Sequence, residues 1–162
     1  MLRPRFVWGP GDTTLVPVIV EMAREGKFMW IDGGRARTST THIDNLAHAI
    51  ALALNNGRAG AAYFVLDDGE RSMREMLTGL AASRGVTLPE RSAPSWLVDA
   101  IGAASETAWR LFDLKGEPPL TRFSAMIMSR DAVLNGDKAR TELGYRPVIG
   151  VEDAMRALAQ SA

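Results

Sequence analysis

The stretch LRPRFVWGPGD at residues 2–12 decides the fold class, because it has the pattern of a short buried β-strand that runs into a tight turn. Its bulky residues favour β-structure and would pack into a core: Leu2, Phe6, Val7 and Trp8. The glycines and the proline at positions 9–11 then end the strand. A parallel strand of this kind is buried on both faces, so we expect it to belong to a larger sheet.

Outward from this strand, the spacing of apolar residues predicts three helices, over 13–26, 44–57 and 72–85. We expect Thr13 or Thr14 to cap the first helix and Asp44 to cap the second. A capping box of Ser72 and Glu75 is expected to begin the third. Glycines follow the last helical positions, as is usual at helix ends.

Extended segments alternate with these helices. A strand over 27–34 is expected to turn at two glycines and return over 35–43, and a further strand is expected over 61–69. In the later part we expect a connector over 88–95, a long helix over 94–115 and a mixed segment over 118–135. Two short helices are expected over 135–147 and 151–160. The alternation predicts an α/β fold in which the opening strand and the strand at 61–69 belong to one sheet.

The amino-acid composition of the chain disfavours several classes of function. The chain has 162 residues, 46% of them hydrophobic, which suffices for one domain with a core. Nineteen basic residues balance nineteen acidic ones, so no overall field favours nucleic acid or an anionic membrane surface. Without cysteine there is no disulfide or thiolate metal site, which favours a reducing cytoplasm. No apolar run approaches the ~20 residues of a membrane span.

The sequence lacks the motifs of a self-sufficient enzyme. There is no Gly-rich phosphate loop, and neither Tyr63 nor Tyr145 is followed by a lysine four residues later, which would make a proton-transfer pair. His42 and His48 fall on different faces of a helix, so structural roles such as packing at a helix start are favoured over metal binding. The adjacent Asp67 and Asp68 point to opposite faces of a strand and indicate a turn.

Two arginine pairs remain as candidate binding residues. Residues two apart on an extended segment share a face, so Arg3 with Arg5, and Arg35 with Arg37, could each present guanidinium groups to a polar ligand or form structural ion pairs. Trp8 is either a core residue or the wall of a pocket. Ligands of open α/β sheets bind beyond the carboxyl ends of the strands, which favours the pocket.

Several segments together resemble one family. They are LRPRFVWGPGD, WIDGG with THIDNLAHAIALAL, AAYFVLDDGERSMREML and NGDKARTELGYRPVIGVEDAM, in this order over almost the whole chain. The chain resembles the second half of extended short-chain dehydrogenases/reductases, the NAD-dependent epimerase/dehydratase enzymes. The segment HIDNLAHA is most similar to their 3β-hydroxysteroid dehydrogenase branch. Each motif alone is loose, but four in sequence are fairly specific.

The resemblance implies roles for single residues. It makes residues 2–8 a late strand of the nucleotide-binding sheet, with Pro4 where the backbone passes the nicotinamide of NAD or NADP. It places Arg5, Phe6 and Trp8 in the substrate pocket, to which Arg35 and Arg37 are added as candidate substrate contacts from their spacing. Phe6 stands where sugar-nucleotide members have asparagine, and Thr38 where many have arginine. These departures favour a less polar small-molecule substrate.

The same resemblance implies that residues 1–162 form a single domain, the carboxyl-terminal, substrate-binding part of a larger oxidoreductase. The Gly-rich loop and the catalytic Tyr and Lys of the family precede the matching stretch, so tight NAD or NADP binding by this chain alone is not expected. We expect the chain to bind one of two partners. One is a second copy, through the edges of the strands at 2–8 and 61–69, and the other is a complementing amino-terminal cofactor-binding part. An alternative is a non-catalytic ligand- or protein-binding regulatory module derived from the family.

Overall fold

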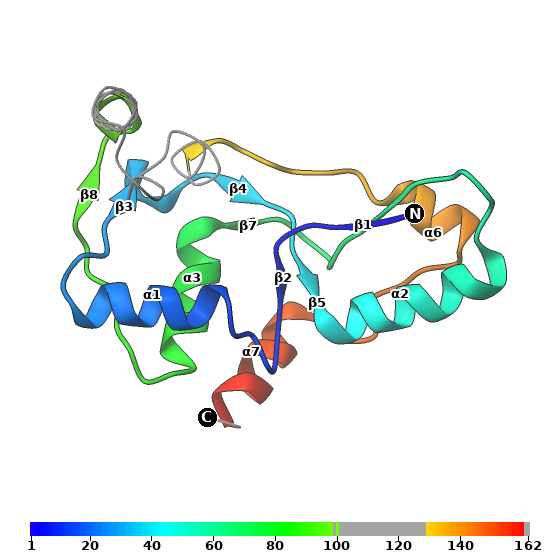
Figure 1. Ribbon diagram of the computed structural model, residues 1–162, viewed down its shortest axis with the longest axis horizontal. Coiled ribbons are helices and arrows are strands. Elements are labelled where there is room, and N and C mark those ends of the chain that lie inside the picture. Colours follow the sequence, from blue (N-terminus) through cyan, green and yellow to red (C-terminus); the bar gives the residue numbers. More distant parts are fainter. Residues whose placement is uncertain (99, 101–128, 161–162) are drawn as a thin grey trace, which may run out of the picture.

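The computed structural model describes residues 1–98, 100 and 129–160 (Figure 1). Within them the chain alternates short strands and helices, as predicted for an α/β fold. Residues 95–98 are helical, but most of the long helix expected over 94–115 lies outside the described residues. So does most of the mixed segment expected over 118–135.

The opening stretch forms two strands where one was expected. β1 (Leu2–Pro4) pairs in parallel with β6 (Tyr63–Val65), and β2 (Val7–Trp8) pairs in parallel with β5 (Thr41–His42). The break falls at Phe6, whose φ of 45° lies in the left-handed region. The pairing of the opening stretch with the strand at 61–69 is confirmed. However, β1 lies at the surface, so the expectation that the whole stretch is buried is wrong.

Four further strands form two other pairs. β3 (Trp30–Ile31) pairs in parallel with β8 (Ser92–Ala93), and β4 (Arg37–Thr38) pairs antiparallel with β7 (Arg71–Ser72). The 3₁₀ turn η1 (Asp32–Gly34) separates β3 from β4. The expected return of 35–43 onto 27–34 therefore does not form a hairpin, and the expected connector at 88–95 contains a strand. In both cases the strands pair with partners that are distant in sequence.

Besides the helical residues 95–98, the described part contains the helices α1 (Leu15–Arg24), α2 (Ile43–Asn56), α3 (Met73–Ala82), α6 (Asp137–Glu142) and α7 (Val151–Gln160). In Figure 1, α1 and α3 lie in one half and α2 and α6 in the other, with β2 and β5 between them. No helix of the described residues is long and apolar enough to cross a membrane.

Helix capping agrees with expectation in position at α1 and α3 and differs from it at α2. The capping box of Ser72 and Glu75 at α3 is confirmed, with both reciprocal hydrogen bonds present. His42 is the N-cap of α2, and its ring accepts a hydrogen bond from the backbone N–H of Asp44, so the prediction that Asp44 itself caps is wrong. Thr14 is the N-cap of α1 by position, but its side chain makes no capping bond.

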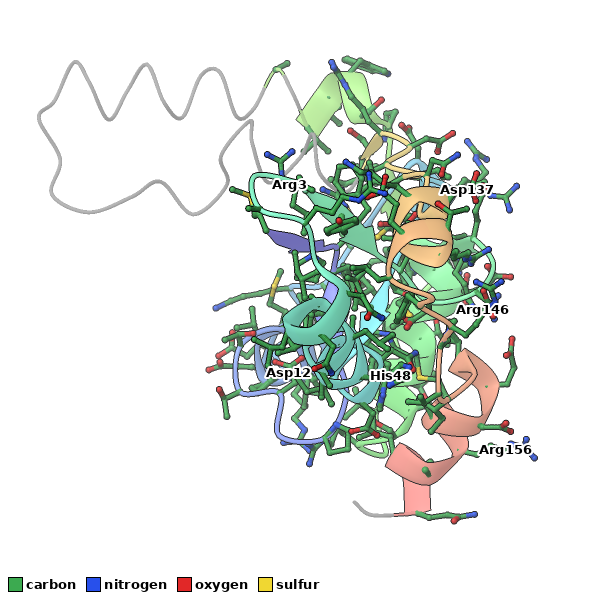
Figure 2. The ribbon with its side chains drawn as sticks, turned by 90° about the vertical axis from the view of Figure 1, so that its right-hand side faces the viewer. Arg3, Asp12, His48, Asp137, Arg146 and Arg156 are labelled. Carbon is green, nitrogen blue, oxygen red and sulfur yellow. The ribbon has the colours of Figure 1, made fainter. Side chains whose placement is uncertain are left out.

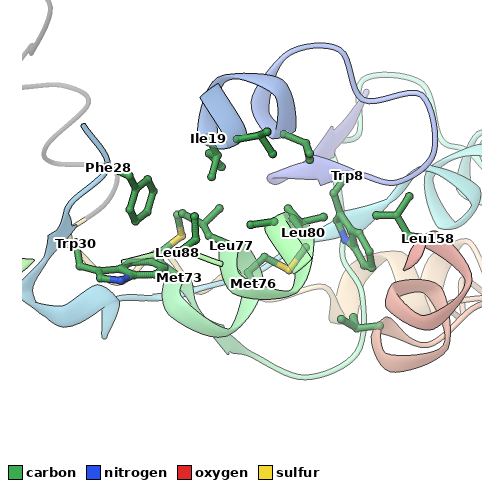
Figure 3. Packing of buried hydrophobic residues seen from close by; sticks show 14 of the residues in the cluster. Trp8, Ile19, Phe28, Trp30, Met73, Met76, Leu77, Leu80, Leu88 and Leu158 are labelled. Carbon is green, nitrogen blue, oxygen red and sulfur yellow. The ribbon is translucent and has the colours of Figure 1, made fainter. Parts of the chain in front are cut away.

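The core has two main parts. The larger lies between α1, α3 and α7 (Figure 3), and its most deeply buried members are Trp8, Phe28, Trp30, Met76, Leu77, Leu80, Ala81 and Ala154. The smaller lies under α2 and α6, where Ala49, Tyr63, Val65, Ala139, Leu143 and Tyr145 pack together. β2 and β5 join the two parts, so the residues at this junction hold the halves of the molecule together.

Asp12 caps α1 from two residues upstream. Its carboxylate accepts the backbone N–H groups of Thr14 (2.8 Å), Leu15 (3.0 Å) and Val16 (3.2 Å). Partial burial acts to raise the pKa of Asp12, but these hydrogen bonds outweigh it, so the pKa lies below its ordinary value. The ionised form is therefore the one that stabilises the helix.

Replacement of Asp12 by alanine is expected to lower the free energy of unfolding at pH 7 by about 1 kcal/mol, because three helix N–H groups lose their acceptor. The contribution is complete above the unfolded pKa of about 3.9 and is lost as the pH falls through the lower folded pKa. Urea denaturation at pH 7 and near pH 3 measures both effects. Thr13→Ala is the control, since Thr13 is exposed. An unchanged midpoint for Asp12→Ala at pH 7 would contradict the assignment.

Candidate functional site

A buried carboxylate lies at the junction of the two halves. Asp67 lies two residues after the end of β6, and only 4% of it is exposed. One carboxylate oxygen accepts the indole N–H of Trp8 (2.9 Å) and the hydroxyl of Thr40 (2.7 Å). The other accepts the backbone N–H of His42 (2.8 Å) and the side-chain N–H of Asn45 (2.7 Å). Four donors, one from β2 and three from residues 40–45, therefore converge on one acceptor-only group.

Asn45 extends this network towards α7. It is fully buried on the inner face of α2, and its amide nitrogen also donates to the carbonyl of Ile149 (3.0 Å). Its amide oxygen accepts the backbone N–H groups of Val148 (2.8 Å) and Ile149 (3.1 Å). Asp67 and Asn45 together therefore fix β2, β5, β6, α2 and the segment before α7 relative to one another.

The sequence prediction for the Asp67 and Asp68 pair is correct in one respect and incomplete in another. The two side chains do point apart, because Asp68 is exposed and accepts a hydrogen bond from Arg140 (2.6 Å). The prediction missed that Asp67 is an internal anchor and not only a turn residue. The available signal was a second polar residue, Asn45, among the apolar positions on the inner face of α2.

His42 has the structural role predicted for it at a helix start. It is buried, caps α2, and its ring lies edge-on to the Trp8 ring at 4.8 Å and 73°. His48 is partly buried beside the ring of Tyr145, with centroids 6.3 Å apart. Among residues 1–98, 100 and 129–160, no three His, Asp or Glu side chains gather in a way that could hold a metal ion.

The residues implied by the family resemblance lie along β1 and β2. Pro4 is exposed at the end of β1. The backbone N–H of Arg5 donates to the hydroxyl of Thr41 (3.0 Å), and Phe6 packs against the larger core. Trp8 is buried with its indole N–H held by Asp67. Contact of these residues with a substrate or cofactor stays a prediction.

A small hollow opens where β2 ends and α2 begins, and we name it the β2 pocket. Its volume is about 240 Å³, and its lining comprises Val7, Trp8, Gly9, Pro10, Gly11, Asp12, Thr13, Thr14 and Ile43. Asp12 is the only charged residue in this lining, and its carboxylate is engaged by the N–H groups of α1. The wall is therefore mainly apolar, with Val7 and Ile43 as its exposed aliphatic side chains.

Arg35 and Arg37 line a different hollow, of about 350 Å³, beside Glu70 and Arg74. Arg37 forms an ion pair with Glu70 (3.1 Å), and its backbone N–H donates to Asp131 (2.8 Å). Arg35 is exposed after η1. The two arginines therefore lie together, as their spacing predicted, but in a different hollow from the residues along β2.

Both tyrosines of the chain have structural partners. The hydroxyl of Tyr63 donates to Glu142 (3.1 Å) and accepts the backbone N–H of Arg58 (3.2 Å). The hydroxyl of Tyr145 donates to the carbonyl of Leu66 (3.1 Å). Burial, together with the nearby negative charge of Asp67, raises the pKa of Tyr145 far above its ordinary value. Neither tyrosine is thus placed for proton transfer to a ligand.

A dinucleotide pyrophosphate binds to free backbone N–H groups at the start of a helix. We therefore compared the N-termini of α1, α2 and α3 with this requirement. At α1 these groups bond to the carboxylate of Asp12. At α2 and α3 the caps are His42 and the Ser72–Glu75 box. These three helix starts therefore do not fit a pyrophosphate.

Comparison with solved structures gives the class of protein. The chain matches a dTDP-glucose 4,6-dehydratase from Bacillus anthracis, solved with NAD, with a TM-score of 0.61 and 19% identity over 98% of this chain and 42% of that one. It matches a UDP-glucose 4-epimerase from Thermotoga maritima, solved with UDP-glucose, with a TM-score of 0.60 and 17% identity over 98% and 44%. The fold is therefore that of part of a Rossmann-type extended short-chain dehydrogenase/reductase.

Comparison with sequences gives the family. Residues 1–94 match the model of the 3-beta hydroxysteroid dehydrogenase/isomerase family, and the chain belongs to this family. It is 39% identical to a 2-alkyl-3-oxoalkanoate reductase of Stenotrophomonas maltophilia, over 99% of this chain and 50% of that protein. It is 34% identical to a 4-hydroxy-2-methyl-3-oxo-4-farnesyl-3,4-dihydroquinoline-1-oxide ketoreductase of Stigmatella aurantiaca, over 99% and 48%. The chain thus spans about half the length of these relatives.

Proposed function

We propose that this chain is the substrate-binding part of an NAD(P)-dependent oxidoreductase that interconverts a ketone and a secondary alcohol. The observation that carries the proposal is the family match over residues 1–94, which includes the β2 pocket. The names of two relatives specify reduction of ketones that bear an alkyl or a farnesyl group. The mainly apolar lining of the β2 pocket supports a substrate of similarly low polarity.

The chain by itself is proposed to be catalytically incomplete. Hydride transfer to a ketone requires a group that donates a proton to the carbonyl oxygen, and in this family a tyrosine is expected to do so. Here Tyr63 and Tyr145 are both engaged in structural hydrogen bonds. The nicotinamide cofactor would supply the hydride, and a separate cofactor-binding part would hold it and provide the acid. The present residues would orient the substrate and exclude water from it.

This proposal predicts two results in one assay of NADH and NADPH oxidation with a 2-alkyl-3-oxoalkanoate as substrate. The isolated chain is expected to show no turnover, because the starts of α1, α2 and α3 do not fit a pyrophosphate and the hydroxyls of Tyr63 and Tyr145 are held in structural hydrogen bonds. A single polypeptide in which the unmatched part of the S. maltophilia relative precedes this chain is expected to reduce the substrate. Turnover by the isolated chain would refute its incompleteness. A joined protein that folds and binds cofactor without reducing the substrate would favour a regulatory module.

A further inference from the structure

The chain contains the dipeptide Asn-Gly twice, at Asn56-Gly57 and at Asn135-Gly136. In such a pair the backbone nitrogen of the glycine can attack the side-chain amide carbon of the asparagine, because glycine has no Cβ to shield its nitrogen. Both asparagines are exposed, so contact with solvent does not distinguish the two sites. They differ in the hydrogen bonds that the attack would have to break.

Asn56-Gly57 is held in an unreactive arrangement at the end of α2. Asn56 is the last residue of the helix, and the backbone N–H of Gly57 donates to the carbonyl of Ala53 (2.9 Å). The side-chain N–H₂ group of Asn56 donates to the carbonyl of Leu143 (3.2 Å). The attacking nitrogen and the leaving group are therefore both engaged. Packing also requires glycine here, since a Cβ on Gly57 would collide with the carbonyl oxygen of Ala53.

Asn135-Gly136 lies directly before α6, and Figure 2 shows the next residue, Asp137, at the edge of the molecule. Within residues 1–98, 100 and 129–160, the backbone N–H of Gly136 has no hydrogen-bond acceptor. A hollow of about 430 Å³ is lined by Asn135 and Gly136 and gives solvent access to this nitrogen. The φ of Gly136 is −95°, and a Cβ there would meet its nearest neighbour at 3.5 Å. Neither backbone conformation nor packing therefore requires glycine at this position.

The side chain of Asn135 is already turned towards the backbone that follows it. Its oxygen Oδ1 accepts the backbone N–H of Asp137 (2.7 Å), and its nitrogen Nδ2 donates to the Asp137 carboxylate (2.9 Å). A side-chain oxygen held two residues ahead brings the amide carbon Cγ towards the intervening nitrogen of Gly136. The N–H of Asp137 also stabilises the negative charge that forms on Oδ1 during an attack. The arrangement thus favours ring closure.

We propose that Asn135 is a site of spontaneous deamidation. The backbone nitrogen of Gly136 loses its proton to solvent base and forms a bond to Cγ of Asn135. The Cγ–Nδ2 bond breaks, and ammonia leaves with a proton from water, so that a cyclic succinimide remains. Water then cleaves one of the two ring bonds to the Gly136 nitrogen, which gives aspartate or isoaspartate at position 135. In sum, ammonia is lost and one water is taken up, with no oxidation or reduction.

Either product would loosen α6 from the smaller core. A carboxylate at position 135 cannot donate to Asp137, so two like charges would face each other where the hydrogen bond was. Isoaspartate also adds one atom to the backbone between α6 and Leu134, whose N–H donates to the hydroxyl of Ser39 (3.0 Å). The helix α6 supplies Ala139 and Leu143 to the smaller core. Deamidation is therefore expected to lower the stability of this half of the molecule.

The test compares the two dipeptides within the same molecule. The chain is incubated at mildly alkaline pH, either folded or in urea, and digested with trypsin, and the deamidated fraction of each peptide is measured by mass spectrometry. In the folded chain Asn135 is expected to react at least about tenfold faster than Asn56, because Asn56-Gly57 must first open two hydrogen bonds. In urea this advantage should disappear, since both sites then present the same flexible dipeptide.

Gly136→Ala is the matched variant, because alanine fits both the φ and the space at this position. Its urea midpoint should not fall, and its Asn135 should react at least about tenfold more slowly while Asn56 is unaffected. Folded chain that has been aged until Asn135 has reacted should unfold at a lower urea concentration than fresh chain. The proposal is overturned if Asn135 reacts no faster than Asn56 in the folded chain, or if Gly136→Ala leaves the rate at Asn135 unchanged.

Discussion

Replacement of Asp67 by leucine is expected to lower the free energy of unfolding by about 4 kcal/mol or more. Four buried donors, on Trp8, Thr40, His42 and Asn45, would lose their acceptor. Each buried donor left unpaired costs about 1–3 kcal/mol, and these costs are not strictly additive. The loss would be a large fraction of the total stability of a domain of this size.

Asp67→Asn separates the hydrogen bonds from the shape of the side chain. An amide keeps one accepting oxygen but faces the remaining two donors with an N–H₂ group, so we expect about 2–3 kcal/mol of destabilisation. Asp68→Asn is the matched control, because Asp68 only forms a solvent-exposed ion pair with Arg140, which contributes little to stability. Urea denaturation measures all three variants. Equal midpoints for Asp67→Asn and Asp68→Asn would rule out Asp67 as an internal anchor.

Replacement of Gly9 by alanine is the second change with a large expected effect, about 3 kcal/mol. Gly9 has a φ of +137°, a conformation that residues with a Cβ rarely adopt. A Cβ there would also lie 2.8 Å from the Ile43 side chain and 2.9 Å from the His42 ring. His42 cannot easily move, because its backbone N–H is held by Asp67. Strain and overpacking therefore add.

Gly11→Ala in the same turn isolates the steric part of this effect. Gly11 also has a positive φ, of +82°, but a Cβ on it would meet no atom within 4 Å. We expect this variant to lose only about 1 kcal/mol, from backbone strain alone. Thermal unfolding of both variants gives the comparison. If the two lose equal stability, the close approach of Gly9 to α2 is not what constrains this turn.

These predictions bear on function because the same residues shape the β2 pocket. Gly9 lines the pocket, and Asp67 holds both Trp8 and the start of α2, which lie on either side of it. The buried network therefore determines how far apart β2 and α2 are held. In the proposed enzyme, this spacing would decide which substrates the apolar wall accepts.

Local sequence signals determined the parts of the fold that depend on neighbouring residues. Interactions within a few residues account for the Gly-Pro-Gly turn at positions 9–11 and for the capping box of Ser72 and Glu75. They also account for the alternation of strands and helices. The order of four loose motifs also indicated the family that the comparison with residues 1–94 shows.

The tertiary structure alone decided which strands pair and what Asp67 does. Trp8 and Asp67 are 59 residues apart in sequence, so nothing local distinguishes this carboxylate from an ordinary turn aspartate such as Asp68. The same holds for β3, which pairs with β8 across a similarly long separation and not with the adjacent segment. A buried polar group is stable only when distant segments bring its partners to it, and that arrangement exists only in the folded chain.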